Sequence, residues 1–428
     1  MEQKFDAIVV GAGPAGCACA YKLAKAGLQT LVVERGKFSG AKNMWGGAFY
    51  GPVMDNVFPN FWESAPFERY VTNQRISVMS DKSCLSVDYI NPKYAAPYNG
   101  FILLRAKFDQ WFASKVQEAG VILATGLAAD DLLMEGNKVC GIKAGNDKLP
   151  ANVVIACDGV NSRLAYKAGL RLELHPNQIK LGVKEVLQFP RSVVEQRFNL
   201  TGDEGIAWEF LGCTQGLPGG GFIYTNKESL SIGIVVQLNA LGQNMVKAYE
   251  LLDEFKKHPT IAKLIEGGTL AEYSAHLIPI SGLSMMPKLY TDGFLVAGDA
   301  AAFVIGTGLV LEGANFAVAS GIAAAETVIK SKEKGDFSRK SLAYYHELLR
   351  RSFVLKDLDT FKEVSHFLEN PRVYTAYPKF VCDLAEKIFS NDGQPRKKTW
   401  QLMQETVKKN KISLVQLARD LLAARRAI

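Results

Sequence analysis

The sequence has few of the residues that build metal centres. Its 428 residues include seven cysteines and five histidines, with no C-x-x-C pair and no recognisable metal-ligand spacing. We therefore expect no metal site and no iron–sulfur cluster carried by this chain. The cysteine pattern is typical of a reducing cytosol. Cys17 and Cys19 fall on roughly opposite sides of a predicted helix, which favours packing over a redox pair.

Long apolar runs and a secretory leader are also missing. The first residues, MEQKFDAIVV, contain an acid and no apolar core of signal-peptide length. No stretch reaches about 18 uninterrupted apolar residues, because the run that starts at Ala300 is interrupted by Glu312 and Asn315. With 48% hydrophobic residues the chain has ample material for a large core. We expect a soluble, cytoplasmic, globular protein.

Excess charge is absent from most of the chain and concentrated at its end. Residues 396–428 contain nine Lys or Arg against two acids, a net charge of +7 that equals the total for the whole chain. Apolar side chains form a stripe on the last predicted helix: Leu414, Leu417, Ala418, Leu421 and Leu422. Such a helix suits an anionic membrane surface, a partner subunit or the body of this protein. Nucleic acid is not expected, because no recognisable binding fold accompanies the charge.

The clearest motif lies at the start of the chain. In DAIVVGAGPAG (residues 6–16) an apolar run breaks at glycines spaced G-x-G-x-x-G, which predicts a strand, a tight turn and a helix. Gly11 permits the turn, Gly13 lets bare backbone approach a pyrophosphate, and Gly16 lets the helix pack closely on the strand. Together with Pro14 and Ala15 they form a helix N-terminus that faces the phosphates of a dinucleotide.

An acid follows this motif at a suitable distance. The apolar run LQTLVVE ends in Glu34, 18 residues past Gly16, where a carboxylate accepts a hydrogen bond from a ribose hydroxyl. We include the next residue, Arg35, in the predicted site. No second G-x-G-x-x-G follows an apolar strand, so we expect one dinucleotide site.

The remaining pattern predicts an α/β fold with α+β elements. A Rossmann-like nucleotide-binding domain is expected from residues 1–74, 101–175 and 291–335. An inserted antiparallel-sheet substrate domain is expected from residues 75–100 and 176–290, where strand-like segments dominate. Residues 336–428 are expected to form a helical C-terminal region that ends in the basic amphipathic tail, with Ser413 and Gln416 as a capping box.

Further motifs indicate which dinucleotide is bound. ACDGVNSR (156–163) and GFLVAGDAA (293–301) each place a carboxylate, Asp158 or Asp299, between a strand and a helix. With the glycine motif and Arg105 they resemble the FAD-dependent flavoproteins of the hydroxylase and reductase superfamily. The resemblance implies FAD, with Arg105 at its phosphates and Gly298 and Asp299 near its ribose and pyrophosphate.

The same resemblance implies which segments lie beside the flavin ring. It puts one turn there, with the residues Gly306, Gly308, Leu309 and Val310. Lys42 and Asn43 lie in a second loop expected beside the ring. They either donate hydrogen bonds to flavin or substrate, or serve the structure of the loop alone.

Three longer stretches narrow the family. GAKNMWGGAFY (40–50), PGGGFIYTNKESLSIGIVV (218–236) and AHLIPISGLSMMPKLYTDGFLVAGDAA (275–301) resemble the electron-transfer flavoprotein:quinone oxidoreductase family, and its FixC branch most closely. The resemblance covers nearly the whole chain. It implies that Gly219 and Gly220 contact a quinone through their backbone N–H groups, whereas the alternative is a turn between two strands.

This resemblance implies a relay of electrons. An FAD-containing subunit would take electrons from the alpha and beta subunits of an electron-transfer flavoprotein and pass them to a quinone, on the cytoplasmic face of a membrane. Long family members carry four cysteines for a [4Fe-4S] cluster, whereas the last 200 residues here contain only Cys382. A small separate ferredoxin-like protein is therefore implied. The FixC branch further suggests an NADH-dependent, electron-bifurcating complex.

No catalytic acid, base or nucleophile is expected, because the flavin supplies the redox chemistry. Three alternatives remain open from the sequence. One is a reductase of isoprenoid chains, similar to geranylgeranyl reductases, and another is an aromatic hydroxylase. The third is a scaffold that keeps the fold without redox activity.

Overall fold

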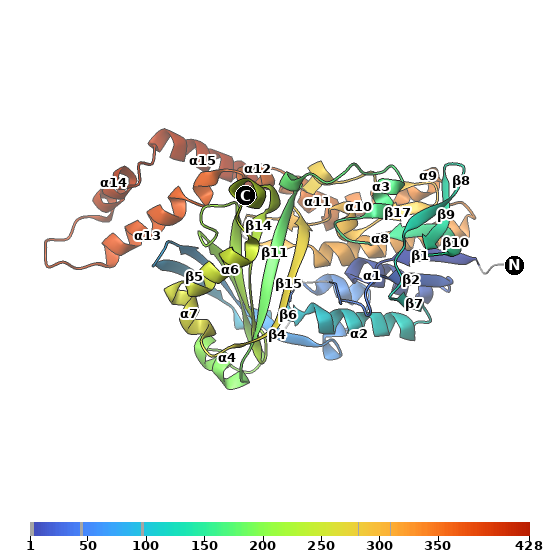
Figure 1. The fold of residues 1–428 in the computed structure, drawn as a ribbon, viewed down its shortest axis with the longest axis horizontal. Helices are drawn as coiled ribbons and strands as arrows, with labels where there is room; N and C mark the ends of the chain where they lie inside the picture. Colours follow the sequence, from blue (N-terminus) through green and yellow to red (C-terminus); the bar gives the residue numbers. More distant parts are fainter. Residues whose placement is uncertain (1–3, 43–45, 96–97, 281, 309) are drawn as a thin grey trace.

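The chain folds around two sheets and ends in a helical extension (Figure 1). The computed structural model describes residues 4–42, 46–95, 98–280, 282–308 and 310–428. The first sheet lies near the N-terminus and the second occupies the middle of the molecule. Helices α13 (Ala376–Phe389) and α14 (Thr399–Lys409) lie at the far end from the first sheet, whereas the C-terminus returns to the middle of the molecule.

The first sheet has the parallel core expected of a nucleotide-binding domain. Its path runs β16-β17-β10-β1-β2-β7, and the parallel strands are β1 (Phe5–Val10), β2 (Thr30–Glu34), β7 (Ile122–Thr125), β10 (Asp147–Ala156) and β17 (Phe294–Val296). The short β16 (Tyr290–Thr291) pairs antiparallel with β17. The central residues of β1, β2, β10 and β17 are buried aliphatics, as in strands covered on both faces, whereas the edge strand β7 is partly exposed. A hairpin of β8 (Asp131–Glu135) and β9 (Lys138–Ala144) extends β10.

Three helices pack together beside this sheet: α1 (Pro14–Lys25), α2 (Arg105–Glu118) and α8 (Ala314–Glu333). Glycines permit their closest contacts. A Cβ added to Gly16 would stand 1.9 Å from the carbonyl oxygen of Gly11, and one on Gly321 would stand 2.2 Å from that of Ala15. These distances leave no room for any side chain, so α1 can lie directly on β1 and α8 directly on α1.

The second sheet has nine strands and one parallel pair. Its path runs β15-β11-β14-β13-β12-β4-β6-β3, with β5 at the side of β4. In chain order these strands are β3 (Gly46–Phe49), β4 (Phe67–Met79), β5 (Cys84–Ile90), β6 (Phe101–Leu104), β11 (Ile179–Gln188), β12 (Glu204–Leu211), β13 (Gly219–Thr225), β14 (Ser229–Gln237) and β15 (Thr269–Pro279). All neighbours are antiparallel except β12 and β4.

One face of this sheet has its own core. Helices α4 (Arg191–Phe198), α6 (Ala248–Lys257) and α7 (Pro259–Ile265) pack there with buried residues such as Ile223, Ile232 and Ile234. The opposite face turns toward the first sheet. Because β3, β4 and β6 join this sheet, it draws on residues outside the expected ranges 75–100 and 176–290.

The C-terminal region is helical, as expected. Its helices are α9 (Arg339–Leu342), α10 (Tyr344–Arg351), α11 (Phe353–Thr360), α12 (Val364–Phe367), α13 (Ala376–Phe389), α14 (Thr399–Lys409) and α15 (Leu414–Ala427). Ser413 caps α15 by accepting a hydrogen bond from the Gln416 N–H at 3.4 Å. Arg372 holds α15 through two hydrogen bonds to Asp420, of 2.6 and 2.8 Å. None of the described helices is long and apolar enough to cross a membrane.

The contact between α1 and α8 gives a test of the packing. Gly321→Ala should destabilise the fold by about 1–3 kcal/mol, because its methyl group would overlap the Ala15 carbonyl. Gly242→Ala is the matched control: it also lies in a helix, α5 (Leu238–Asn244), but a Cβ there meets nothing within 4 Å. The control should be neutral or slightly stabilising. Equal effects of both variants in urea unfolding would contradict the close contact.

Candidate functional site

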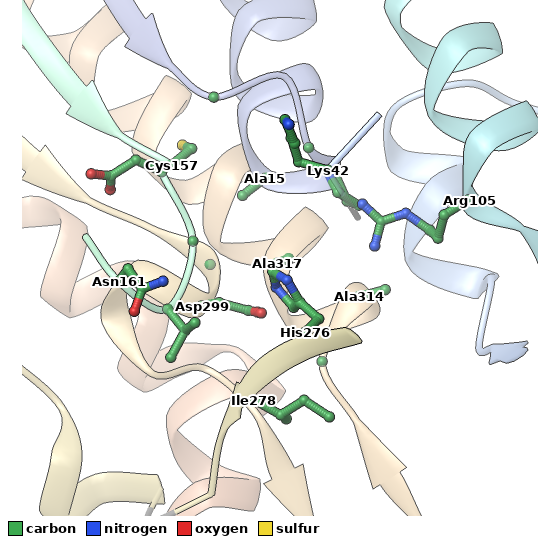
Figure 2. A pocket seen from close by; sticks show the side chains of 18 of the residues that line it. Ala15, Lys42, Arg105, Cys157, Asn161, His276, Ile278, Asp299, Ala314 and Ala317 are labelled. Carbon is green, nitrogen blue, oxygen red and sulfur yellow. The ribbon is translucent and has the colours of Figure 1, made fainter. Parts of the chain in front are cut away.

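A large cavity separates the two sheets. Its volume is about 720 Å³, within the range of about 300–1,000 Å³ that is typical of ligand clefts. It opens at the carboxyl ends of the parallel strands, which is where α/β sheets bind ligands. Figure 2 shows Lys42 and Arg105 on one side of it and His276 and Ile278 of β15 on another.

The N-terminus of α1 forms the floor of the cavity. Gly13 is the N-cap, Pro14 begins the helix, and both line the cavity with Ala15. A Cβ on Gly13 would find only the Arg105 Nη2 atom, at 4.0 Å, so this glycine faces open space. Arg105 is held in place by two hydrogen bonds of 2.6 Å to Asp109. Exposed helix N–H groups beside a fixed guanidinium make a site for a pyrophosphate.

Gly11 and Gly16 have different roles at the N-terminus of α1. Gly11 lines the cavity and has φ +102°, a left-handed conformation that favours glycine. Its added Cβ would overlap the Cys157 carbonyl oxygen at 2.3 Å. Gly16 is buried against the backbone of Gly11 and does not line the cavity, so its role is the packing role predicted for it.

The Glu34 carboxylate lines the cavity and already accepts two backbone hydrogen bonds. Ala12 donates to Oε2 at 2.9 Å and Gly36 donates to Oε1 at 2.6 Å. A carboxylate has about four acceptor positions, so Glu34 retains capacity for ribose hydroxyls. These two bonds also join the glycine turn to the end of β2. Arg35 and Lys42 line the same part of the cavity.

Two buried carboxylates complete the cofactor half. Burial raises the pKa of Asp158, and it raises the pKa of Asp299 to about 6 although the nearby Arg105 cation lowers it. Within the described part of the chain, Asp158 Oδ1 has no hydrogen-bond partner, while Oδ2 accepts from Leu164 N–H at 3.5 Å. A buried acceptor without a donor suits a ligand hydroxyl or bound water. Gly298, next to Asp299, also lines the cavity.

The predicted turn before α8 is the tip of a small hairpin. β18 (Ile305–Gly306) pairs with β19 (Leu311–Glu312), and Thr307 N–H donates to the Val310 carbonyl at 3.0 Å. Val304 and Leu311 at its base line the cavity, whereas Gly306, Gly308 and Val310 do not. The predictions for Leu309 and Asn43 lie outside the described residues.

The second wall of the cavity comes from one face of the nine-stranded sheet, and the sequence analysis missed it. Its residues alternate along four strands: Glu209 on β12, Phe222 and Tyr224 on β13, Val235 on β14, and His276 and Ile278 on β15. The sequence signal that could have identified this wall is the presence of polar residues in otherwise apolar strands. Burial, followed by the nearby cations Arg105 and Arg35, lowers the pKa of His276 to about 4, so its imidazole is neutral at pH 7.

The predicted quinone glycines lie within a strand. Gly219 and Gly220 begin β13 and pair with Val236 and Val235 of β14, so the alternative that they form a turn is wrong. Gly220 shares the face of β13 that carries Phe222 and Tyr224. Neither glycine lines the cavity, although Val235, the partner of Gly220, does. A quinone would therefore meet Val235 and Phe222 first.

The open position of Gly13 allows a test of the expected FAD site. Gly13→Val should leave a folded protein that purifies with little or no flavin, because its side chain fills the space where the pyrophosphate approaches. Flavin absorbance per chain and far-UV circular dichroism measure both properties. Normal flavin content in a folded Gly13→Val protein would contradict the assignment.

Three family models match the chain. They are FAD dependent oxidoreductase over residues 6–215, the ETF-QO ubiquinone-binding model over residues 179–278, and the ETF-QO/FixC family C-terminal domain over residues 364–428. The first covers the α1 floor and the second covers β11 to most of β15, including the second wall. FAD is thus the cofactor, and the chain is a flavin-dependent oxidoreductase.

Full-length relatives agree with these models. A probable electron transfer flavoprotein-quinone oxidoreductase, YdiS, from Escherichia coli K12 is 42% identical, and the protein FixC of the same strain is 41% identical. Each alignment covers 98% of both chains. A geranylgeranyl bacteriochlorophyll reductase-like structure from Thermoplasma acidophilum has a TM-score of 0.73 at 21% identity, covering 98% of this chain and 99% of that one, which shows the shared fold. The chain belongs to the electron-transfer flavoprotein:quinone oxidoreductase and FixC family.

Proposed function

We propose that this chain is an electron-transfer subunit that takes electrons from an electron-transfer flavoprotein, through a separate iron–sulfur protein, and delivers them to a quinone. The observation that carries the proposal is the large cavity with two unlike walls. A polar floor suited to FAD faces an apolar wall of Phe222, Val235 and Ile278. Relatives named for electron transfer to quinone support this assignment. FAD supplies one- and two-electron chemistry when bound.

The chain's own residues position and shield that chemistry. The α1 N-terminus and Arg105 bind the pyrophosphate, Glu34 and Asp158 accept ligand hydroxyl groups, and the second sheet excludes water from the other side. We assign these roles to the predicted site residues that line the cavity. The division into an FAD-binding part, a strand-rich part and a helical C-terminal part belongs to the same proposal.

The basic tail is proposed to rest on an anionic membrane surface. Four apolar side chains of α15 are exposed: Leu414, Val415, Leu421 and Leu422. Basic residues of the same helix are also at the surface. An amphipathic helix with basic flanks binds such surfaces, and each basic residue contributes about 1 kcal/mol. This location brings the cavity close to a membrane quinone. The FixC resemblance further suggests that the complex bifurcates electrons from NADH.

Anaerobic reduction of the bound FAD tests the electron source. NADH or NADPH alone should leave the flavin spectrum of the purified chain unchanged, because the described part of the chain presents one dinucleotide cavity and the FAD occupies it. Addition of an electron-transfer flavoprotein and a ferredoxin-like protein, with their reductant, should bleach the flavin. A quinone analogue should then restore the spectrum.

Bleaching by nicotinamide alone would contradict the relay and favour a reductase or hydroxylase. A matched titration of the partner proteins without this chain controls for their own absorbance. Reduction of an added isoprenoid double bond during turnover would identify the substrate as a prenyl chain instead of a quinone.

A further inference from the structure

A carboxylic acid and a phenol form a hydrogen-bonded pair on the second wall. The Tyr224 hydroxyl donates to Glu209 Oε1 at 2.8 Å, and both side chains line the cavity. They stand on adjacent strands, with Glu209 paired to Phe222 and Ala207 paired to Tyr224. The pair therefore belongs to the wall that faces the FAD half and does not belong to the cofactor floor.

Rigid packing fixes the orientation of the pair. The Tyr224 ring stacks on Phe222 with centroids 5.1 Å apart, and a Cβ on Gly47 would stand only 2.5 Å from the Tyr224 ring. Gly47 in β3 thus lets the ring lie flat against the backbone. Tyr224 has no freedom to turn its hydroxyl away from Glu209 without leaving this packing.

Few other charged groups surround Glu209. Tyr50, which follows β3 and bonds to Gln74 of β4, lies close enough for Glu209 to raise its pKa. Burial raises the pKa of Cys213, which follows β12, and the negative charge of Glu209 raises it further. The pKa of Tyr50 is also raised by the negative charge of Glu312, on β19 of the small hairpin. Burial raises the pKa of Glu209 itself to about 7, against a lowering by the Tyr224 hydrogen bond. Near neutral pH this carboxyl therefore carries a proton for about half of the time.

Reduction of a quinone needs two protons as well as two electrons, and the other cavity groups are poorly suited to donate them. His276 is neutral at pH 7, with its pKa lowered to about 4. Arg105 is committed to Asp109. Asp299 belongs to the cofactor half beside Gly298 and the α1 floor. Glu209 is the acid on the quinone side of the cavity.

We propose that Glu209 transfers a proton to the bound quinone and that Tyr224 is the positioning residue that aims its carboxyl. The inference rests on the proposed quinone reductase function. The O–H bond of the Glu209 carboxyl breaks as an O–H bond forms on one quinone oxygen. FAD in its reduced form would supply the electron pair and release its own protons to solvent, and solvent would return one proton to the second quinone oxygen and one to the Glu209 carboxylate before the next turnover.

The pH dependence of stability reports the proton on Glu209 independently of turnover. The pKa is raised from 4.5 in the unfolded chain to about 7 in the folded one, so the folded state holds the extra proton between these values. Stability due to this group therefore falls as pH rises from about 4.5 to 7 and stays lower above pH 7. Glu209→Gln keeps the shape and the acceptor for Tyr224 but does not titrate. Its melting temperature should rise relative to wild type between pH 5 and 8.

Reoxidation of the FAD-loaded chain tests the transfer. The bound FAD is reduced with stoichiometric dithionite under nitrogen and mixed with a short-chain ubiquinone analogue or with ferricyanide, which accepts electrons without protons. Glu209→Gln should slow reoxidation by the quinone about 100-fold and leave the rate with ferricyanide unchanged. Tyr224→Phe should slow the quinone reaction less and shift its pH profile. Glu185→Gln is the matched control, because Glu185 binds Lys256 outside the cavity, at 2.9 and 3.0 Å.

Each outcome decides one question. If wild type reacts with ferricyanide but not with the quinone, the proposed function fails. If wild type reacts with the quinone and Glu209→Gln matches it at every pH, the function stands and the proton-transfer role is wrong. Equal slowing with both acceptors, or identical melting profiles of wild type and Glu209→Gln, would likewise overturn that role.

Discussion

Close backbone contacts around α1 determine how its N-terminus meets the cavity. Gly11, Gly16 and Gly321 each stand where a Cβ would lie within 2.3 Å of a backbone carbonyl oxygen. Because side chains are absent there, α1 rests directly on β1 and α8, the turn before it lies against the backbone that follows β10, and its positive N-terminal end opens into the cavity. Arg105, fixed by Asp109, reinforces that field. The position of the cofactor follows from this packing.

The second sheet supplies the apolar surface of the cavity. Its strands present Phe222, Val235 and Ile278 toward the cofactor half, so an apolar acceptor finds an apolar surface close to the flavin. Within that surface lies the pair of Glu209 and Tyr224. The proposed function depends on both sides of the cavity: a polar floor suited to FAD, and a wall that combines apolar side chains with the acid Glu209.

Local patterns in the sequence pointed to several residues that line one half of the cavity. The glycine motif, Glu34, Asp158 and Asp299 all lie at strand ends, where a few consecutive residues determine the geometry, and these acids line the cavity as expected. The second wall could not be predicted in the same way, because Glu209 and His276 reach the same cavity wall only through the pairing of strands far apart in the sequence. The same non-local pairing brings β3, β4 and β6 into the second sheet.

A crystal structure of the FAD-loaded chain with a short-chain ubiquinone analogue tests the central claim most directly. We expect the pyrophosphate at Gly13 and Arg105, and the quinone ring between the flavin and the wall that carries Glu209 and Val235. A quinone oxygen should lie within hydrogen-bond distance of the Glu209 carboxyl. A ring bound elsewhere, or a wall that contacts the flavin with no space for a quinone, would contradict the account.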